Sequence, residues 1–244
     1  MSPNMHAGEG AGAADSRRRT LAIAGGLMVG GFLVNVILTA ALHPSGEEDD
    51  HPAIFAKYAD SSSWIAVHLG QFIGVLVTLS GLLVLYRVLR SADESSLVAR
   101  LAAAAAVATA AVWAVLQGLD GVGLKQAVDS WVSASGTEKQ IRFANAETVR
   151  WLEWGFQSYF RILLGLTLAL FGIAILTGRR VPGWLGWTAL VAGVCSVVFG
   201  VDVGYSGLAS GLQDVLGIAI FVLVLVFAFG VFVTGVHGHG RRHD

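Results

Sequence analysis

The sequence predicts an all-α protein: an integral membrane bundle of six transmembrane helices with both termini in the cytoplasm. Hydrophobic residues make up 55% of the chain and charged residues only 14%, with a mean hydropathy of +0.66. This composition leaves too little polar surface to cover a water-soluble fold. Six apolar segments reach the ~20 residues that a helix needs to cross a bilayer core of ~30 Å. Arginines gather on one side of this six-pass arrangement, as is typical of the cytoplasmic side.

The six predicted spans are joined by connectors that are charged or rich in turn-forming residues, such as 91–96 and 178–183. The spans cover residues 21–42, 64–86, 101–119, 154–177, 184–201 and 215–236. Together they define one transmembrane domain over residues 20–237. Residues 1–19 are rich in Gly, Ala and Ser and predict a disordered cytoplasmic tail, and residues 238–244 predict a second cytoplasmic tail.

The placement of charge predicts the orientation. The arginines assigned to the cytoplasmic side are Arg17, Arg18, Arg19, Arg87, Arg90, Arg100, Arg179, Arg180, Arg241 and Arg242. The acidic run 47–50 and the lysines Lys57, Lys125 and Lys139 fall on the other side. The excess of positive charge on one side therefore orients the bundle, although the lysines make it a bias and not an absolute rule.

The outer connectors are predicted to have helical structure of their own. Pro52 suits the first turn of a short helix that we expect to lie on the membrane surface. Its apolar face is formed by Ile54, Phe55 and Tyr58. The third span is predicted to continue beyond the bilayer through Leu124, Val128 and Trp131. Thr137 with Gln140 forms a capping-box pattern that would open a long extension into the fourth span.

Close helix packing is predicted at three G-x-x-x-G pairs, because glycine lets two helix backbones approach each other. These pairs are Gly26/Gly30, Gly70/Gly74 and Gly200/Gly204. They are structural signals, and they carry no functional weight.

Four spans place an ionisable residue at one level near the outer surface. At a rise of 1.5 Å per residue, each lies roughly 27–30 Å from its cytoplasmic anchor. These residues are His68, Asp120, Arg161 and Asp202. In the fourth span, polar residues recur every three or four positions at Glu147, Arg150, Glu153, Gln157 and Arg161. Such a stripe should face the bundle interior or a wet cavity, because lipid offers polar groups no partners.

Two interpretations of this polar layer remain open. In the first, the groups only hold the helices in register, for instance through an Asp120–Arg161 ion pair. In the second, they line an outward-open pocket that binds a small molecule or an ion. The predicted ligand-binding residues are His68, Gln71, Asp120, Glu153, Gln157, Arg161 and Asp202. In that pocket Arg161 would engage an anion or carboxylate, and His68 would confer pH sensitivity.

Three functions follow from these interpretations. The leading hypothesis is a non-enzymatic transport or ligand-sensing component with an outward-facing polar pocket. The alternatives are a membrane-embedded enzyme that uses His68 with nearby carboxylates, and a structural or assembly subunit. The expected partner is the lipid bilayer, with homo- or hetero-oligomers left open. A net charge of -1 gives no support for a nucleic-acid partner.

Several chemistries are disfavoured by the residues present. Cys195 is the only cysteine, so disulfide exchange through a cysteine pair is excluded. A bis-histidine haem is disfavoured because only His68 lies within a predicted span. His43, His51 and His68 with the outer carboxylates are ligand types for a metal, but they show no ligand spacing such as H-E-x-x-H. The sequence therefore assigns no metal ligand, no catalytic residue and no cofactor.

The stretch near the first outer loop consists of Leu42-His43-Pro44, the acidic loop, Phe55-Ala56-Lys57-Tyr58, and a run from Trp64 to Phe72 that reads WIAVHLGQF. With these residues the chain resembles uncharacterised multi-pass membrane proteins of bacteria. The resemblance covers most of the chain after residue 20 and points to a domain-of-unknown-function family with six predicted transmembrane helices. It implies a location in a bacterial plasma (inner) membrane, and it carries over no functional residues.

Overall fold

The computed structural model describes residues 4–90 and 95–237, and these residues form helices joined by short connectors, with no strand among them. Within these residues, six helices are long and apolar enough to cross a membrane. The spanning segments are formed by α1 (Asn4–Leu42), α3 (Trp64–Leu89), α4 (Ser95–Gly118) continued by η1 (Leu119–Leu124) and α5 (Lys125–Ser133), α6 (Gly136–Gly178), α7 (Gly183–Ser206) and α8 (Gly211–Val236). The predicted all-α membrane bundle is confirmed.

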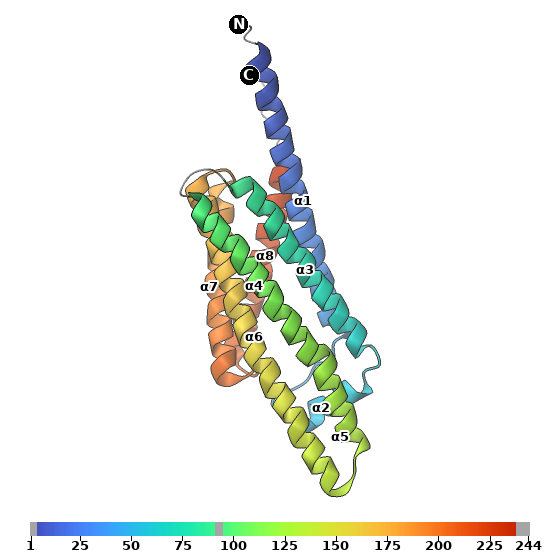
Figure 1. The fold of residues 1–244 in the computed structure, drawn as a ribbon. Helices are drawn as coiled ribbons and strands as arrows, with labels where there is room; N and C mark the ends of the chain where they lie inside the picture. Colours follow the sequence, from blue (N-terminus) through green and yellow to red (C-terminus); the bar gives the residue numbers. More distant parts are fainter. Residues whose placement is uncertain (1–3, 91–94, 238–244) are drawn as a thin grey trace.

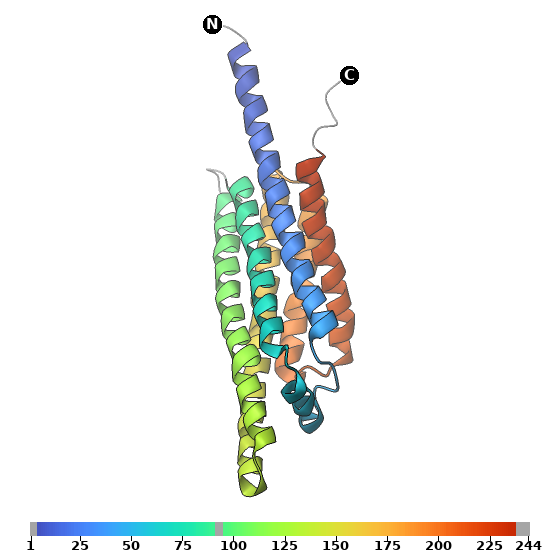
Figure 2. The ribbon, with the colours of Figure 1, turned by 90° about the vertical axis from the view of Figure 1, so that its right-hand side faces the viewer.

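The six spanning helices form a closed ring. The helices pack in the order α1, α3, α4, α6, α7 and α8, and α8 returns to α1. Figures 1 and 2 show α1 projecting beyond the bundle at one end and the α5–α6 hairpin projecting at the other. The short helix α2 (His51–Asp60) lies at the α5 end. A ring of this kind encloses a central space, and that space holds the candidate site.

The third span continues past the bundle as predicted, with one irregularity. The π-helical turn η1 joins α4 to α5, and the residues on either side of it keep right-handed helical dihedrals. The extension of α6 is also present, but the predicted capping box is wrong. Helix α6 begins at Gly136 with Ser135 as its N-cap, because the positive φ of Gly136 completes the reversal from α5 before Thr137 is reached.

The apolar face of the short helix α2 packs against protein. The prediction that this helix lies on the membrane surface is therefore wrong for its apolar face. Asp50 caps it by accepting a hydrogen bond from the backbone N–H of Ala53, and a proline occupies its first turn. The side chains of Ile54, Phe55 and Tyr58 are at most 1% exposed. They belong to a cluster with Trp64, Leu124, Val128 and Ala146. The extended α5 and α6 supply this apolar wall, so α2 covers one end of the bundle.

Glycines bring neighbouring helices into backbone contact, though partly at other positions than predicted. In α1, Gly31 faces the carbonyl oxygen of Gly74, and a Cβ built on Gly31 would lie 2.4 Å from it. Gly30, named in the predicted pair, has nothing within 4 Å of such a Cβ. The packing face of α1 therefore contains Gly31, one residue beyond the Gly30 of the predicted G-x-x-x-G pair. The pairs Gly165/Gly193 and Gly172/Gly186 bring α6 and α7 together in the same way.

The arginine-rich ends of the helices meet at the end of the bundle opposite α2. There Arg17, Arg87, Arg90 and Arg180 border a common surface pocket. Helix α1 begins at Asn4, inside the stretch 1–19 for which the composition predicts a disordered tail. The predicted tail at 238–244 lies outside the described residues. The cytoplasmic location of the arginine-rich end remains a prediction from the charge bias.

Cysteine labelling tests this orientation. In a Cys195→Ala background, we expect Thr137→Cys at the α6 start to react with a membrane-impermeant maleimide in intact cells. Ser16→Cys in α1 should react only after permeabilisation, because it lies at the arginine-rich end. Both positions are exposed in the folded chain, so access to the reagent should depend on the membrane alone. Labelling of Ser16→Cys but not of Thr137→Cys in intact cells would show the opposite orientation, with the arginine-rich end outside the cell.

Candidate functional site

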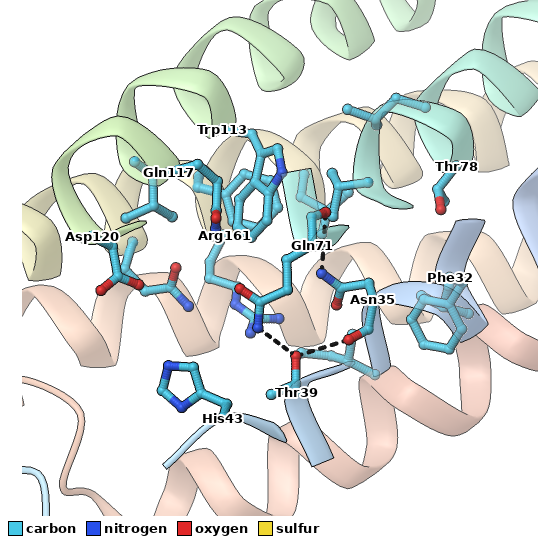
Figure 3. A pocket seen from close by; sticks show the side chains of 18 of the residues that line it. Phe32, Asn35, Thr39, His43, Gln71, Thr78, Trp113, Gln117, Asp120 and Arg161 are labelled. Atoms are coloured by element: carbon cyan, nitrogen blue, oxygen red, sulfur yellow. Dashed lines mark hydrogen bonds between the residues drawn. The ribbon is translucent and has the colours of Figure 1, made fainter. Parts of the chain in front are cut away.

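A cavity of about 390 Å³ lies inside the ring of helices. It is lined by residues of α1, α2, α3, α4, η1, α6 and α8, and by residues of the α1–α2 and α7–α8 connectors. Figure 3 shows side chains from several of these helices converging on it. Its volume falls in the range of ~300–1,000 Å³ that is typical of small-molecule sites.

The lining changes from apolar to polar toward the α2 end. Along α1 the lining residues run from Met28 and Phe32 to Asn35, Thr39 and His43. Along α6, which runs in the opposite direction, they run from Leu168 and Leu164 through Arg161 and Gln157 to Glu153 and Arg150. The cavity is therefore amphipathic, with one apolar half and one polar half.

The α2 end of the cavity is lined by a buried charge network around Arg150. The Arg150 Nη1 donates to Glu153 Oε2 at 2.7 Å, and the Nη2 donates to Glu48 Oε2. Arg150 and Glu153 are each 3% exposed. The Tyr58 hydroxyl also donates to Glu48 at 3.0 Å, and burial raises the pKa of this phenol above its usual value. These four residues tie the acidic loop, α2 and α6 together, with the one guanidinium shared between two carboxylates.

A second polar group joins α3 to η1. His68 Nε2 lies 3.1 Å from Asp120 Oδ2, and His68 Nδ1 lies 2.8 Å from the carbonyl oxygen of Trp64. The Trp64 indole N–H donates to the carbonyl oxygen of Asp120 at 3.1 Å. A Cβ built on Gly121 would lie 2.6 Å from the His68 Cβ. Glycine at this position therefore lets the π-turn approach α3 closely enough for the His68–Asp120 contact.

His43 approaches the same group from the end of α1. Its ring lies 5.3 Å from that of His68 and 5.0 Å from that of Trp64, measured between ring centroids. Its Nδ1 lies 2.8 Å from the carbonyl oxygen of Pro44. Desolvation by burial lowers the pKa of His43 from its ordinary value, against a smaller opposing effect of the Asp120 carboxylate. His43, His68 and Asp120 each offer a ligand atom, and these atoms lie within 4.8 Å of one another.

Arg161 differs from Arg150 because it has no carboxylate partner. No carboxylate oxygen of the described residues lies within 4.0 Å of its guanidinium, and no hydrogen bond from that guanidinium to a described residue is formed. Its Nε is buried without an acceptor, and its Cζ lies 4.6 Å from the centroid of the Phe199 ring. Figure 3 shows the side chain pointing into the cavity. The Asp120–Arg161 ion pair considered above is not formed, because Asp120 faces His68.

A short chain of neutral polar groups lies in the polar half of the same cavity wall as Arg161. The Gln71 amide donates to Thr39 Oγ1 at 2.8 Å, and that hydroxyl donates to the carbonyl oxygen of Asn35 at 2.9 Å. The Asn35 amide in turn faces the Gln71 carbonyl oxygen at 3.5 Å (Figure 3). These bonds hold α1 and α3 together and fix one side of the polar half.

The seven residues predicted to bind a ligand occupy three different locations relative to the cavity. Five of them line the cavity: Gln71, Asp120, Glu153, Gln157 and Arg161. His68 is 3% exposed and borders the cavity through Asp120. Asp202 lies apart, where its carboxylate accepts a hydrogen bond of 2.7 Å from the Gln213 amide at the junction of α7 and α8.

Several lining residues were not predicted from the sequence. Asn35, Thr39 and His43 recur every four positions at the end of the first span, which is the spacing of one helix face. That pattern could have identified them as the counterpart of the stripe on α6. The contribution of Glu48 had no such signal, because it depends on where the loop after α1 comes to lie.

The comparisons with known proteins identify a family without assigning an activity. No curated protein and no solved structure matches the chain. One family profile, described as a domain of unknown function (DUF4386), matches residues 23–237. This range contains nearly all of the spanning helices and every residue that lines the cavity. The chain therefore belongs to the DUF4386 family of domains of unknown function.

Proposed function

We propose that the protein binds an amphiphilic anion in its central cavity, as a transport or ligand-sensing component of the membrane. The carboxylate or phosphate head group of the ligand lies against Arg161, and its apolar tail occupies the apolar half of the cavity. This proposal retains the pocket hypothesis drawn from the sequence, and it names the class of ligand.

The observation that carries the proposal is the uncompensated guanidinium of Arg161. The Arg161 side chain is half-buried and its Nε is fully buried. A cation that is partly withdrawn from water without a counter-ion is unfavourable, and an anion at the same place offsets that penalty. The other arginine that lines the cavity already has partners, because Arg150 is paired with Glu48 and Glu153. Arg161 is thus the arginine in the cavity wall whose counter-ion a ligand would supply.

The apolar half of the cavity supports the second feature of the ligand. Leu79 and Leu82 of α3, Leu164 and Leu168 of α6 and Val224 of α8 contribute to it. Burying an alkyl chain among such side chains is worth ~0.8 kcal/mol per methylene. A head group alone would leave this space unused, so an alkyl or isoprenoid tail fits the cavity better than a small ion does.

Binding of tritiated dodecanoate to immobilised purified protein tests the proposal. We expect saturable binding by the parent chain and at least ~10-fold weaker binding by Arg161→Gln, because a buried charged contact is lost. Dodecanol, the uncharged analogue, should displace little dodecanoate from the parent chain. It should displace about equally little from the Arg161→Gln variant. Arg142→Gln removes an exposed arginine that pairs with Glu138 and should leave dodecanoate binding unchanged.

Equal binding of dodecanoate to the parent, Arg161→Gln and Arg142→Gln would rule out a head-group role for Arg161. Thermal unfolding of the same proteins separates the structural-subunit alternative. If Arg161 only holds helices together, Arg161→Gln should unfold at a lower temperature. If it awaits an anion, removing an uncompensated charge should leave the ligand-free protein equally stable or more stable.

A further inference from the structure

We infer that His43, His68 and Asp120 bind one divalent transition-metal ion, with Zn²⁺ as the reference case. Imidazole nitrogens and a carboxylate oxygen are ligands that Zn²⁺ accepts readily. The inference does not depend on the amphiphilic ligand, because it uses none of the contacts of Arg161. It assigns a role to three residues that come from the end of α1, from α3 and from the π-turn η1.

The two histidines are oriented in the same way toward backbone carbonyl groups. Nδ1 of His68 faces the carbonyl oxygen of Trp64, and Nδ1 of His43 faces that of Pro44, each at 2.8 Å. A carbonyl oxygen can only accept, so each Nδ1 carries its hydrogen and each Nε2 is left to coordinate. An Nδ1–H bond to a backbone carbonyl is the usual outer contact of a metal-bound histidine.

The distances suit a shared ion. Two ligand atoms that bind Zn²⁺ tetrahedrally at ~2.0–2.1 Å lie about 3.3 Å apart. His68 Nε2 and Asp120 Oδ2 are 3.1 Å apart, and one ligand atom from each of His43, His68 and Asp120 lies within 4.8 Å of the other two. His43 follows the last residue of α1 and belongs to a connector, so binding requires its side chain to move toward the other two ligands.

The second carboxylate oxygen of Asp120 is an independent indication. Asp120 Oδ1 is buried and accepts no hydrogen bond from a described residue. A buried acceptor without a donor is unfavourable unless something else satisfies it, and a cation does so. Together the His43 and His68 nitrogens and this carboxylate present donors of electron pairs, and among the described residues His68 is the only basic side chain within 4.0 Å of the Asp120 carboxylate.

The surroundings favour a site that is held rigidly and remains open on one side. Trp64 packs against both histidine rings and fixes the Asp120 backbone through its indole N–H. His43 and Asp120 also line the cavity, so the coordination positions that the protein leaves vacant face it. Three protein ligands with an open position are typical of metal sites that bind a further molecule.

Zinc titration of the full chain tests the inference. The protein carries a non-histidine affinity tag and the substitutions His237→Ala, His239→Ala and His243→Ala, because the C-terminal histidines form a second source of ligands. After treatment with a chelator, we expect one equivalent of Zn²⁺ to bind by calorimetry and Co²⁺ to give visible absorption bands of a four- or five-coordinate ion. His43→Ala and Asp120→Asn should each weaken Zn²⁺ binding by at least ~10-fold.

His51→Gln is the matched control. His51 is also buried and is paired with a carboxylate, Glu147, but it lies outside the proposed group. Zn²⁺ binding should survive in this variant, and Zn²⁺ should raise the unfolding temperature of the parent and of His51→Gln only. Failure of the parent to bind one equivalent, or binding that His43→Ala and Asp120→Asn leave unchanged, would overturn the inference. Equal loss in His51→Gln would overturn it as well, since the effect would then not be specific to these ligands.

Discussion

Arg150→Met is expected to lower the free energy of unfolding by ~3–5 kcal/mol, as the removal of one partner from a buried ion pair does. The substitution leaves the Glu153 carboxylate, which is 3% exposed, and the Glu48 carboxylate without their cation. It also removes the contacts of the guanidinium with the rings of Tyr58 and Trp154. Unfolding of the purified protein in mixed micelles, followed by tryptophan fluorescence, measures the change.

Two further variants separate charge from packing. Arg142→Met breaks an exposed pair with Glu138 and should change the unfolding free energy by no more than ~0.5 kcal/mol. Glu48→Gln and Glu153→Gln added to Arg150→Met should restore part of the loss, because they remove the uncompensated charges. If Arg150→Met lowers the free energy of unfolding no more than Arg142→Met does, the charge network does not hold the α2 end of the bundle together.

The loop after α1 should respond to the same substitution. Glu48 belongs to the acidic run 47–50, and Arg150 and Tyr58 hold its side chain from two different helices. This loop also carries His43 into the cavity wall. The position of Glu48 therefore depends on a cation from α6 that is more than a hundred residues away in the chain, and this explains why the sequence alone could not place it.

The fold followed from the sequence because its signals are local. A run of ~20 apolar residues defines a span without reference to any other part of the chain. The inward direction of the α6 stripe was also predictable, since helical periodicity alone puts Glu153, Gln157 and Arg161 on one face. All three side chains line the cavity, but Glu153 is paired with Arg150, while Arg161 has no carboxylate partner among the described residues.

The site was less predictable because its partners are distant in sequence. The pairing of Asp120 with His68 in place of Arg161 depends on the π-turn and on the close approach at Gly121. The burial of α2 depends on the apolar wall that the extended α5 and α6 provide. Neither the register of a π-turn nor the partner of an amphipathic face is contained in hydrophobic periodicity, so both had to come from the three-dimensional arrangement.

Trp64→Ala is expected to destabilise the protein by ~3–5 kcal/mol, the loss typical of removing a large aromatic side chain from a core. Trp64 is 1% exposed at the start of α3, and its ring lies 4.3 Å from the rings of both Tyr58 and His68. Its removal leaves a cavity between α2 and η1 and frees the carbonyl oxygen of Asp120. The unfolding free energy in mixed micelles is the measurement.

Trp64→Phe shows whether this residue acts by filling space or by its hydrogen bond. Phenylalanine keeps most of the ring contacts with Tyr58 and His68 but cannot donate to Asp120, so we expect a loss of about 0.5–1.5 kcal/mol beyond the change in size. Phe55→Leu, in the same apolar cluster but without a polar contact, gives the cost of packing alone. If Trp64→Phe were as damaging as Trp64→Ala, the indole N–H and not the volume of the ring would hold η1 against α3. The geometry of Asp120 would then depend on a single hydrogen bond from the neighbouring helix.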